Sequence, residues 1–255
     1  MNDSWTLSLL FALVFLCAGL VKGVTGMGLP TIAMGLLGTM MPPVAAAALL
    51  VVPSFTTNLW QLMAGPAKAR LMRRLWPMML GVVLGTVAST TLLVTVEPAG
   101  SRLALGASLM AYAVYALFSP ALAVPARAEP WLSPVMGLVT GGVTGATGVF
   151  VMPAVPYLQA LHLEKDELVQ ALGLSFTIST VALALGLMAH GAFRVNQLGV
   201  SVLAIIPAFA GMWLGQKIRA RISPQRFRQY FLLFLIALGA ELAWRPFGWR
   251  TLIHL

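Results

Sequence analysis

Charged side chains are scarce in this sequence: they make up 9% of its 255 residues, whereas hydrophobic residues make up 59%. Soluble domains carry about 25% charged residues. Because so few charges do not cover a water-facing surface, lipid must be the solvent for much of the chain. The length then accommodates six to nine membrane segments of about 20 residues each. The composition therefore predicts an all-α, polytopic membrane protein.

Cysteine is nearly absent as well. The single cysteine, Cys17, lies in an apolar run, which excludes a disulfide or a cysteine-based metal site within one chain. The apolar segments contain no pair of carboxylates, no metal-ligand spacing and no nucleophile triad. A Walker motif for ATP is also missing. We therefore expect no cofactor and no metal, and an intramembrane enzyme or an assembly factor ranks below a transporter.

Acidic residues are outnumbered by basic ones, 7 to 16, and the positive excess is concentrated in two places. Nine of the 16 Lys and Arg lie in the stretches 68–74 and 217–228, which contain no acidic residue. Cytoplasmic loops of membrane proteins show this enrichment. It explains the net charge of +9 without nucleic acid, and it predicts that both stretches face the cytoplasm.

Long apolar runs mark the membrane segments. A Pro- and Ala-rich connector, 119–130, divides them into a first repeat, 1–118, and a second repeat, 131–255. Each repeat begins with an apolar unit that glycines and prolines interrupt, and three further runs follow it. We therefore expect six full transmembrane helices and two broken or re-entrant units. The six runs are 44–64, 77–96, 103–118, 168–189, 195–216 and 229–244.

The two halves share short motifs in the same order. The motif Gly-Val-Thr-Gly starts at Gly23 and again at Gly142, and Ser-Phe-Thr starts at Ser54 and at Ser175. The pattern Gly-x-x-Leu-Gly occurs at 81–85 and 211–215. Four ordered matches, counting Glu-Pro at 97–98 against Ser-Pro at 223–224, indicate an internal duplication.

The basic stretches lie at different places in the two repeats. The first precedes the Gly-x-x-Leu-Gly pattern of its half, and the second follows the pattern of its half. If both face the cytoplasm, equivalent loops lie on opposite sides of the membrane. The charge pattern therefore predicts two inverted repeats.

The interrupted units carry the candidate site. In the first half, a glycine-rich break at 23–28 precedes the short run 29–41, which is about 20 Å long as a helix and too short to cross the membrane. In the second half, the break at 141–148 precedes 149–161. Non-helical backbone at membrane depth lines protein or a cavity, and the start of a helix attracts an anion. Two such breaks predict a site for a small anion.

Hydroxyl and amide side chains in neighbouring runs extend this candidate site. Small residues in membrane helices more often serve helix packing than binding. We prefer this interpretation for Gly19, Gly35, Gly81, Gly85, Gly211 and Gly215. Ser and Thr hydroxyls often donate to the backbone of their own helix. For the Ser and Thr residues that follow Ser54 and Ser175 at helical spacing, both interpretations stay open: a local hydrogen bond or a place in the site. The candidate substrate-binding residues are Lys22, Gly23, Thr25, Gly26, Gly28, Ser54, Thr57, Asn58, Gly142, Thr144, Gly145, Thr147, Gly148, Ser175 and Ser179.

Lys22 is the sharpest single candidate. If the first unit enters the membrane as a hairpin, Lys22 lies at depth, where a buried cation is costly and marks function. If the first unit is a full span, Lys22 lies at a membrane face. Both pictures stay open from the sequence.

The segment 18–30, Ala-Gly-Leu-Val-Lys-Gly-Val-Thr-Gly-Met-Gly-Leu-Pro, resembles the first motif of the sulfite exporter TauE/SafE family. The segment 142–153 is similar to that family's repeat motif, and the resemblance covers essentially the whole chain. One departure is that relatives often carry more glycines where Met27 and Leu29 stand. The resemblance implies transport of sulfite, sulfonates or other organosulfur anions across the bacterial cytoplasmic membrane.

These observations predict a secondary transporter that exports a small oxyanion. The alternatives are an uptake carrier or a channel for a different small anion. The expected partners are the anionic substrate and the lipid bilayer, with no nucleic acid, and the sequence leaves open whether the chain forms a homo-oligomer.

Overall fold

The computed structural model describes residues 2–118, 122–193, 195–219 and 221–252. Every regular element in these residues is a helix, as the composition predicted. The helices of the first half are α1 (Asn2–Thr25), α2 (Leu29–Met40), α3 (Pro43–Met63), α4 (Lys68–Thr95) and α5 (Pro98–Phe118). Those of the second half are α6 (Glu129–Thr147), α7 (Ala154–Ala160), α8 (Lys165–Ala189), α9 (Val195–Leu203), α10 (Ile205–Arg219) and α11 (Pro224–Leu252).

Seven helical segments among the described residues are long and apolar enough to cross a membrane. They comprise the six expected full spans, together with Thr6–Thr25 of α1, because the first unit is one continuous helix up to Thr25. At 1.5 Å per residue, the 24 residues of α1 extend about 36 Å. The chain is therefore a multi-pass membrane protein, and its first segment is not a re-entrant hairpin.

The first basic stretch is helical rather than a loop. Helix α4 begins at Lys68, so Arg70, Arg73 and Arg74 lie on its first two turns, nine residues ahead of the expected start at Pro77. Lys and Arg are good helix formers, and these turns extend beyond the apolar part of the helix. Arg70 pairs with Glu167 at the start of α8, and Arg74 Nε lies 2.6 Å from Glu129 Oε1 at the start of α6.

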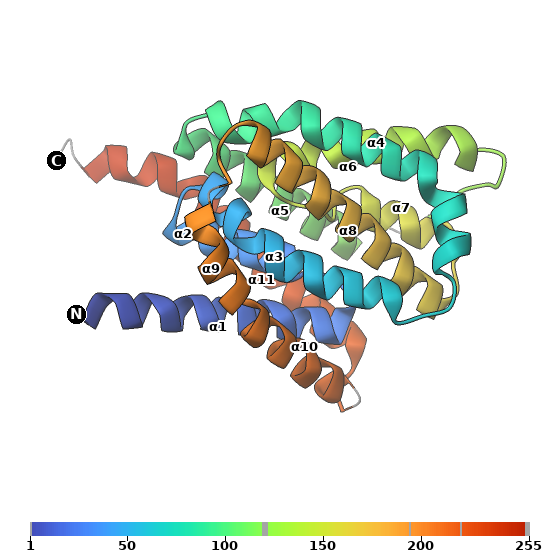
Figure 1. Cartoon of the computed structure of the whole chain (residues 1–255), viewed down its shortest axis with the longest axis horizontal. Helices are drawn as coiled ribbons and strands as arrows, with labels where there is room; N and C mark the ends of the chain where they lie inside the picture. The colour runs from blue at the N-terminus through green and yellow to red at the C-terminus, as the bar shows by residue number, and fades with distance from the viewer. Residues whose placement is uncertain (1, 119–121, 194, 220, 253–255) are drawn as a thin grey trace.

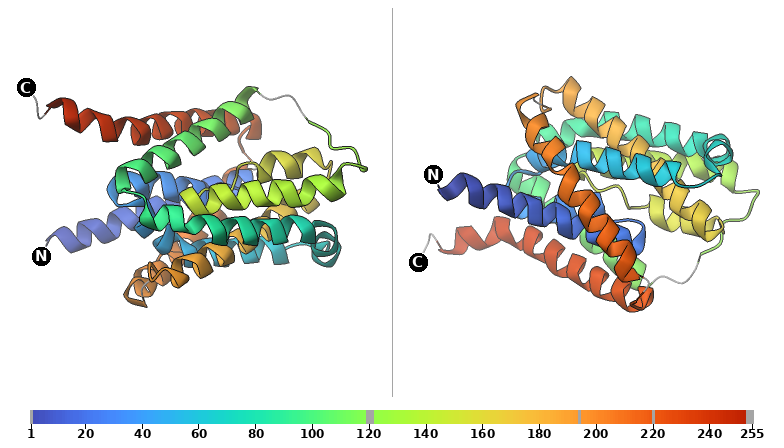
Figure 2. Two further views of the ribbon diagram at one scale, coloured as in Figure 1. Left: turned by 90° about the horizontal axis from the view of Figure 1, so that it is seen from above. Right: turned by 60° about the horizontal axis from the view of Figure 1, so that its bottom comes forward.

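The two halves run in opposite directions through the bundle. In Figures 1 and 2, α1, α3 and α5 run away from the side that holds both chain ends, whereas their counterparts α6, α8 and α11 run toward it. Both basic stretches, at the start of α4 and between α10 and α11, lie on the side away from the chain ends (Figure 1). We call this the basic side. The arrangement is the inverted repeat that the charge pattern predicted.

Helices of one half pack mainly against helices of the other half. Helix α4 packs along α6 and α10 along α1, while α3 packs on α8 and α5 on α11. A Cβ added at Gly85 would meet the backbone of α6 at Leu138 and Gly142, and one at Gly215 would meet α1 at Leu20 and Gly23. Small residues allow membrane helices this close approach. The Gly-x-x-Leu-Gly patterns are therefore packing positions, as preferred from the sequence.

Candidate functional site

The centre of the candidate site is Lys22, which lies one turn before the end of α1 and is only 2% exposed. Its Nζ donates a hydrogen bond to Thr57 Oγ1 at 3.2 Å and another to Asn58 Oδ1, both on α3. None of the ion pairs among the described residues includes Lys22. The structure thus combines two sequence pictures: α1 is long enough to be a full span, yet its lysine is buried against α3.

The polar side chains of α3 continue this cluster along one helix face. Ser54 lies four residues before Asn58, so the two share a face of α3. Ser54 Oγ and Asn58 Nδ2 are buried and have no hydrogen-bond partner among the described residues. Thr57 Oγ1 instead donates to Pro53 O of its own helix, at 2.7 Å. Two neutral donors beside a buried ammonium group are a suitable set for holding an anion.

Gln61, one turn further along α3, ties this cluster to the first break. Its Nε2 donates to Gly26 O at 2.8 Å and to Val169 O of α8 at 2.7 Å. The amide thus satisfies a carbonyl that the end of α1 leaves free, and it joins three elements from both halves. Gln61 is not among the candidate site residues predicted from the sequence.

The first break lies at 26–28, after Thr25. Gly26 and Gly28 have φ values of 78° and 104°, a left-handed backbone that favours glycine. Thr25 Oγ1 accepts from Met27 N at 3.2 Å and donates to Val21 O at 2.9 Å, which fixes the turn. Helix α2 starts at once with Leu29. This is the predicted pattern of a helix, a glycine break and a short helix.

The second break comes three residues later in its helix than the matching motif predicted. Helix α6 continues through Gly142–Gly145 and ends at Thr147, and Gly148 takes the left-handed conformation with φ 72°. Thr147 Oγ1 accepts from Val149 N at 3.2 Å and donates to Val143 O at 2.7 Å, as Thr25 does in the first half. The structural equivalent of Gly23–Gly26 is therefore the later segment Gly145-Ala146-Thr147-Gly148.

This shift places Thr144 where the first half has Lys22. The amide N–H of Gly26 bonds to Lys22 O, and that of Gly148 bonds to Thr144 O. Thr144 is buried, and its Oγ1 donates to Val149 O at 3.2 Å. The chain after Gly148 is irregular and forms a turn at 152–153 before α7, which has only seven residues, so the expected helix start beside the second break is absent within these described residues. The two breaks are therefore not equivalent anion holders.

Three of the predicted glycines lie within helices. Gly23 packs against α10, where an added Cβ would meet Met212 O, and Gly145 packs against α4 at Ser89 and Thr86. Both positions thus bring helix backbones together. Gly142 has no atom within 4 Å of an added Cβ. No contact described for these glycines reaches the Lys22 cluster.

Ser175 and Ser179 share one face of α8, which packs against α3. Both hydroxyl oxygens are buried without a hydrogen-bond partner among the described residues. They are the counterparts of Ser54 and Asn58 in the duplication, at a constant separation of 121 residues. Unpaired polar atoms thus occur at matching places on both central helices, although Lys22 is on one side only.

A cavity of about 210 Å³ opens at the first break. Thr25 and Met27 line it from the break, and Tyr112 of α5 lies beside them, with its Oη 3.5 Å from Met27 Sδ. Its remaining polar lining consists of Gln159, Lys165, Arg219 and Arg228. The sequence alone places Arg219 and Arg228 in a basic cytoplasmic stretch, and it indicates no role for Lys165.

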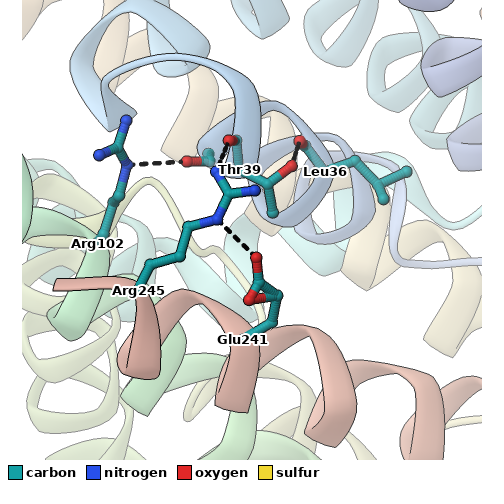
Figure 3. A network of polar contacts seen from close by, with 6 residues as sticks. Leu36, Thr39, Arg102, Glu241 and Arg245 are labelled. Atoms are coloured by element: carbon teal, nitrogen blue, oxygen red, sulfur yellow. Dashed lines mark hydrogen bonds and ion pairs between the residues drawn. The ribbon is translucent and has the colours of Figure 1, made fainter. Parts of the chain in front are cut away.

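Two arginines hold the other end of α2, on the side of the chain ends (Figure 3). Arg102 Nε of α5 donates to Gly38 O at 3.1 Å, and Arg245 Nη1 of α11 donates to Thr39 O. Arg245 Nε also lies 2.6 Å from Glu241 Oε1. The last carbonyls of a helix carry partial negative charge, so two guanidinium groups stabilise this short helix in place.

The geometry is that of a membrane protein with interrupted helices, a buried cation and inverted halves. No match was found among curated proteins or among solved structures. The family model described as sulfite exporter TauE/SafE matches residues 11–242, which is nearly the whole chain. The chain therefore belongs to the sulfite exporter TauE/SafE family, a family of membrane transporters.

Proposed function

We propose that this protein is a secondary transporter that exports sulfite or a related small organosulfur anion across the bacterial cytoplasmic membrane. The observation that carries the proposal is the burial of Lys22 with neutral hydrogen-bond partners only. A buried charge is costly unless an opposite charge pairs with it. A substrate anion bound beside Nζ supplies that charge.

The neighbours of Lys22 match the chemistry of an oxyanion. Ser54 Oγ and Asn58 Nδ2 are donors without partners among the described residues, and sulfite and sulfonates present several acceptor oxygens. The break at Gly26–Gly28 lies one turn away from Lys22 along the chain. Non-helical backbone at this place gives the anion a polar route through an otherwise apolar bundle.

The membrane potential favours export of an anion. A charge of −1 that leaves a cell at −100 mV gains about 2.3 kcal/mol, so export needs no ATP. With the basic side in the cytoplasm, the cavity at the first break faces the compartment from which the anion is taken.

Flux of ³⁵S-labelled sulfite into inside-out vesicles tests the proposal. We expect saturable uptake that unlabelled sulfite inside the vesicles accelerates by counter-exchange. Linear uptake without counter-exchange would indicate a channel, and flux only in the opposite orientation would indicate an importer. A panel of taurine, an alkyl sulfonate, sulfate and chloride in the same assay ranks the substrates.

Lys22→Met removes the charge and keeps much of the side-chain stem. We expect the half-saturation constant for sulfite to rise at least about tenfold, or about 1.4 kcal/mol, with a partial loss in Lys22→Arg because the charge stays while the shape changes. Lys68→Met is the matched control, since Lys68 is exposed at the start of α4. With protein levels equalised, an unchanged constant in Lys22→Met would remove Lys22 from the site.

A further inference from the structure

The cavity at the first break is lined by cations other than Lys22. Three cations line it from three helices: Lys165 from α8, Arg219 from α10 and Arg228 from α11. No acidic side chain is among its lining residues. The nearest acidic residues along the chain are Glu164, Asp166 and Glu167 beside Lys165, and Glu167 pairs with Arg70.

These three cations have hydrogen-bond donors available for a ligand. None of the ion pairs among the described residues includes Lys165, Arg219 or Arg228. Arg228 Nη2 donates to Ala116 O at 3.1 Å, and a guanidinium group has five N–H donors. The counterpart of Arg228 is Arg102, because each is the fifth residue of its helix, α11 and α5 respectively. Arg102 lies at the other end of the bundle, where it donates to Gly38 O.

The shape of the cavity leads from the basic side toward the site. A second cavity, of about 380 Å³, shares Tyr112, Gln159 and Arg228 with the first. Thr25 and Met27, a few residues from Lys22, also line the first cavity. The two cavities adjoin at the residues they share, and we treat them together as a basic vestibule, which we define by Gln159, Lys165, Arg219 and Arg228.

We infer that this vestibule is a second anion-binding site, in which an oxyanion is held by Arg219, Arg228 and Lys165 before it reaches Lys22. The inference rests on the proposed function for the direction of travel. Multiple cations in a partly enclosed space raise the local concentration of anions. Two guanidinium groups also offer the paired donors that suit a divalent oxyanion such as sulfate or sulfite.

A thiol placed in the vestibule reports on it without any transport. Gln159→Cys, in a Cys17→Ser background, puts an exposed thiol on the lining of both cavities. Its conversion to a mixed disulfide by an anionic and a cationic methanethiosulfonate of similar size, with methanesulfinate as the leaving group, is measured in inside-out vesicles at low ionic strength. We expect the anionic reagent to react at least about tenfold faster, relative to the same ratio for free cysteine.

Neutralising the vestibule tests the assignment. Arg219→Gln with Arg228→Gln is expected to abolish the preference for the anionic reagent. Arg221→Gln with Arg226→Gln is the matched control: it removes the same charge from exposed positions of the same basic stretch that do not line either cavity. If the anionic-to-cationic rate ratio of Gln159→Cys equals that of free cysteine, the vestibule assignment is wrong. It is also wrong if both double variants lower this ratio equally.

Sulfate protection separates binding from simple attraction. At constant ionic strength, sulfate is expected to slow the thiosulfonate reaction of Gln159→Cys more than chloride does, and this difference is expected to vanish in the Arg219/Arg228 double variant. Equal protection by both salts overturns a binding site. Because the readout is disulfide formation at the introduced thiol, absence of sulfite flux in the parent vesicles and absence of vestibule binding are distinguishable outcomes.

Discussion

The role we assign to Lys22 depends on the groups that surround its ammonium group. Its ammonium group contacts only a hydroxyl and an amide oxygen among the described residues. These dipoles stabilise a cation but do not neutralise it, so the pocket keeps a positive potential that a mobile anion can use. A carboxylate in place of either partner would instead form a permanent ion pair.

Asn58→Asp is the substitution that follows from this argument. A carboxylate beside Lys22 Nζ occupies the electrostatic role of the substrate, so we expect the half-saturation constant for sulfite to rise at least about tenfold. We also expect the thermal midpoint in detergent to stay level or rise, because the buried cation gains a partner. Asn58→Leu, which removes the contact without adding charge, is expected to lower that midpoint. Sulfite flux with an unaltered constant in Asn58→Asp would contradict the role of Lys22.

At the scale of the helix, glycines serve two different purposes. Gly26, Gly28 and Gly148 have left-handed backbone at the breaks. Gly81, Gly85, Gly211 and Gly215 remove side-chain volume where α4 meets α6 and α10 meets α1. The first group shapes the chain and the second sets the distance between helices, so the same substitution has different consequences in the two groups.

Gly85→Ala and Gly142→Ala make a direct comparison on the packed pair α4 and α6. The new methyl of Gly85→Ala meets the backbone of α6, so we expect a loss of about 1–3 kcal/mol of stability. Gly142→Ala meets no atom within 4 Å in a helical segment, so its stability is expected to be equal or slightly higher. Thermal unfolding in detergent measures both. Reduced sulfite flux in a stable Gly142→Ala would support the predicted site-lining role of Gly142, and equal midpoints would contradict the packing argument.

For the whole molecule, apolar runs and basic stretches were sufficient to predict the helical bundle and its inversion, because lipid imposes both patterns directly on the sequence. The sequence left the burial of Lys22 open, since it depends on the tertiary position of Thr57 and Asn58 on α3, which the lysine side chain reaches. The second break was misplaced for a different reason. Gly142–Gly145 and Gly145–Gly148 both fit the looser pattern Gly-x-Thr-Gly, and only the backbone conformation at Gly148 distinguishes them.

The inversion itself predicts the labelling of four thiols placed singly in a Cys17→Ser background. Ala69 lies at the start of α4 and Ser223 directly before α11, and both of these helix ends are on the basic side (Figure 1). Glu97 lies between α4 and α5 and Ala189 at the end of α8, and these helix ends are on the side of the chain ends. In the duplication, Ala69 is the counterpart of the loop after Ala189, and Glu97 is the counterpart of Ser223. In intact cells, an impermeant maleimide should therefore label cysteines at 97 and 189 and leave those at 69 and 223 unlabelled until the membrane is permeabilised. Labelling of both members of either equivalent pair would mean that the halves run parallel, and it would remove the physical basis for a vestibule that opens to the cytoplasm.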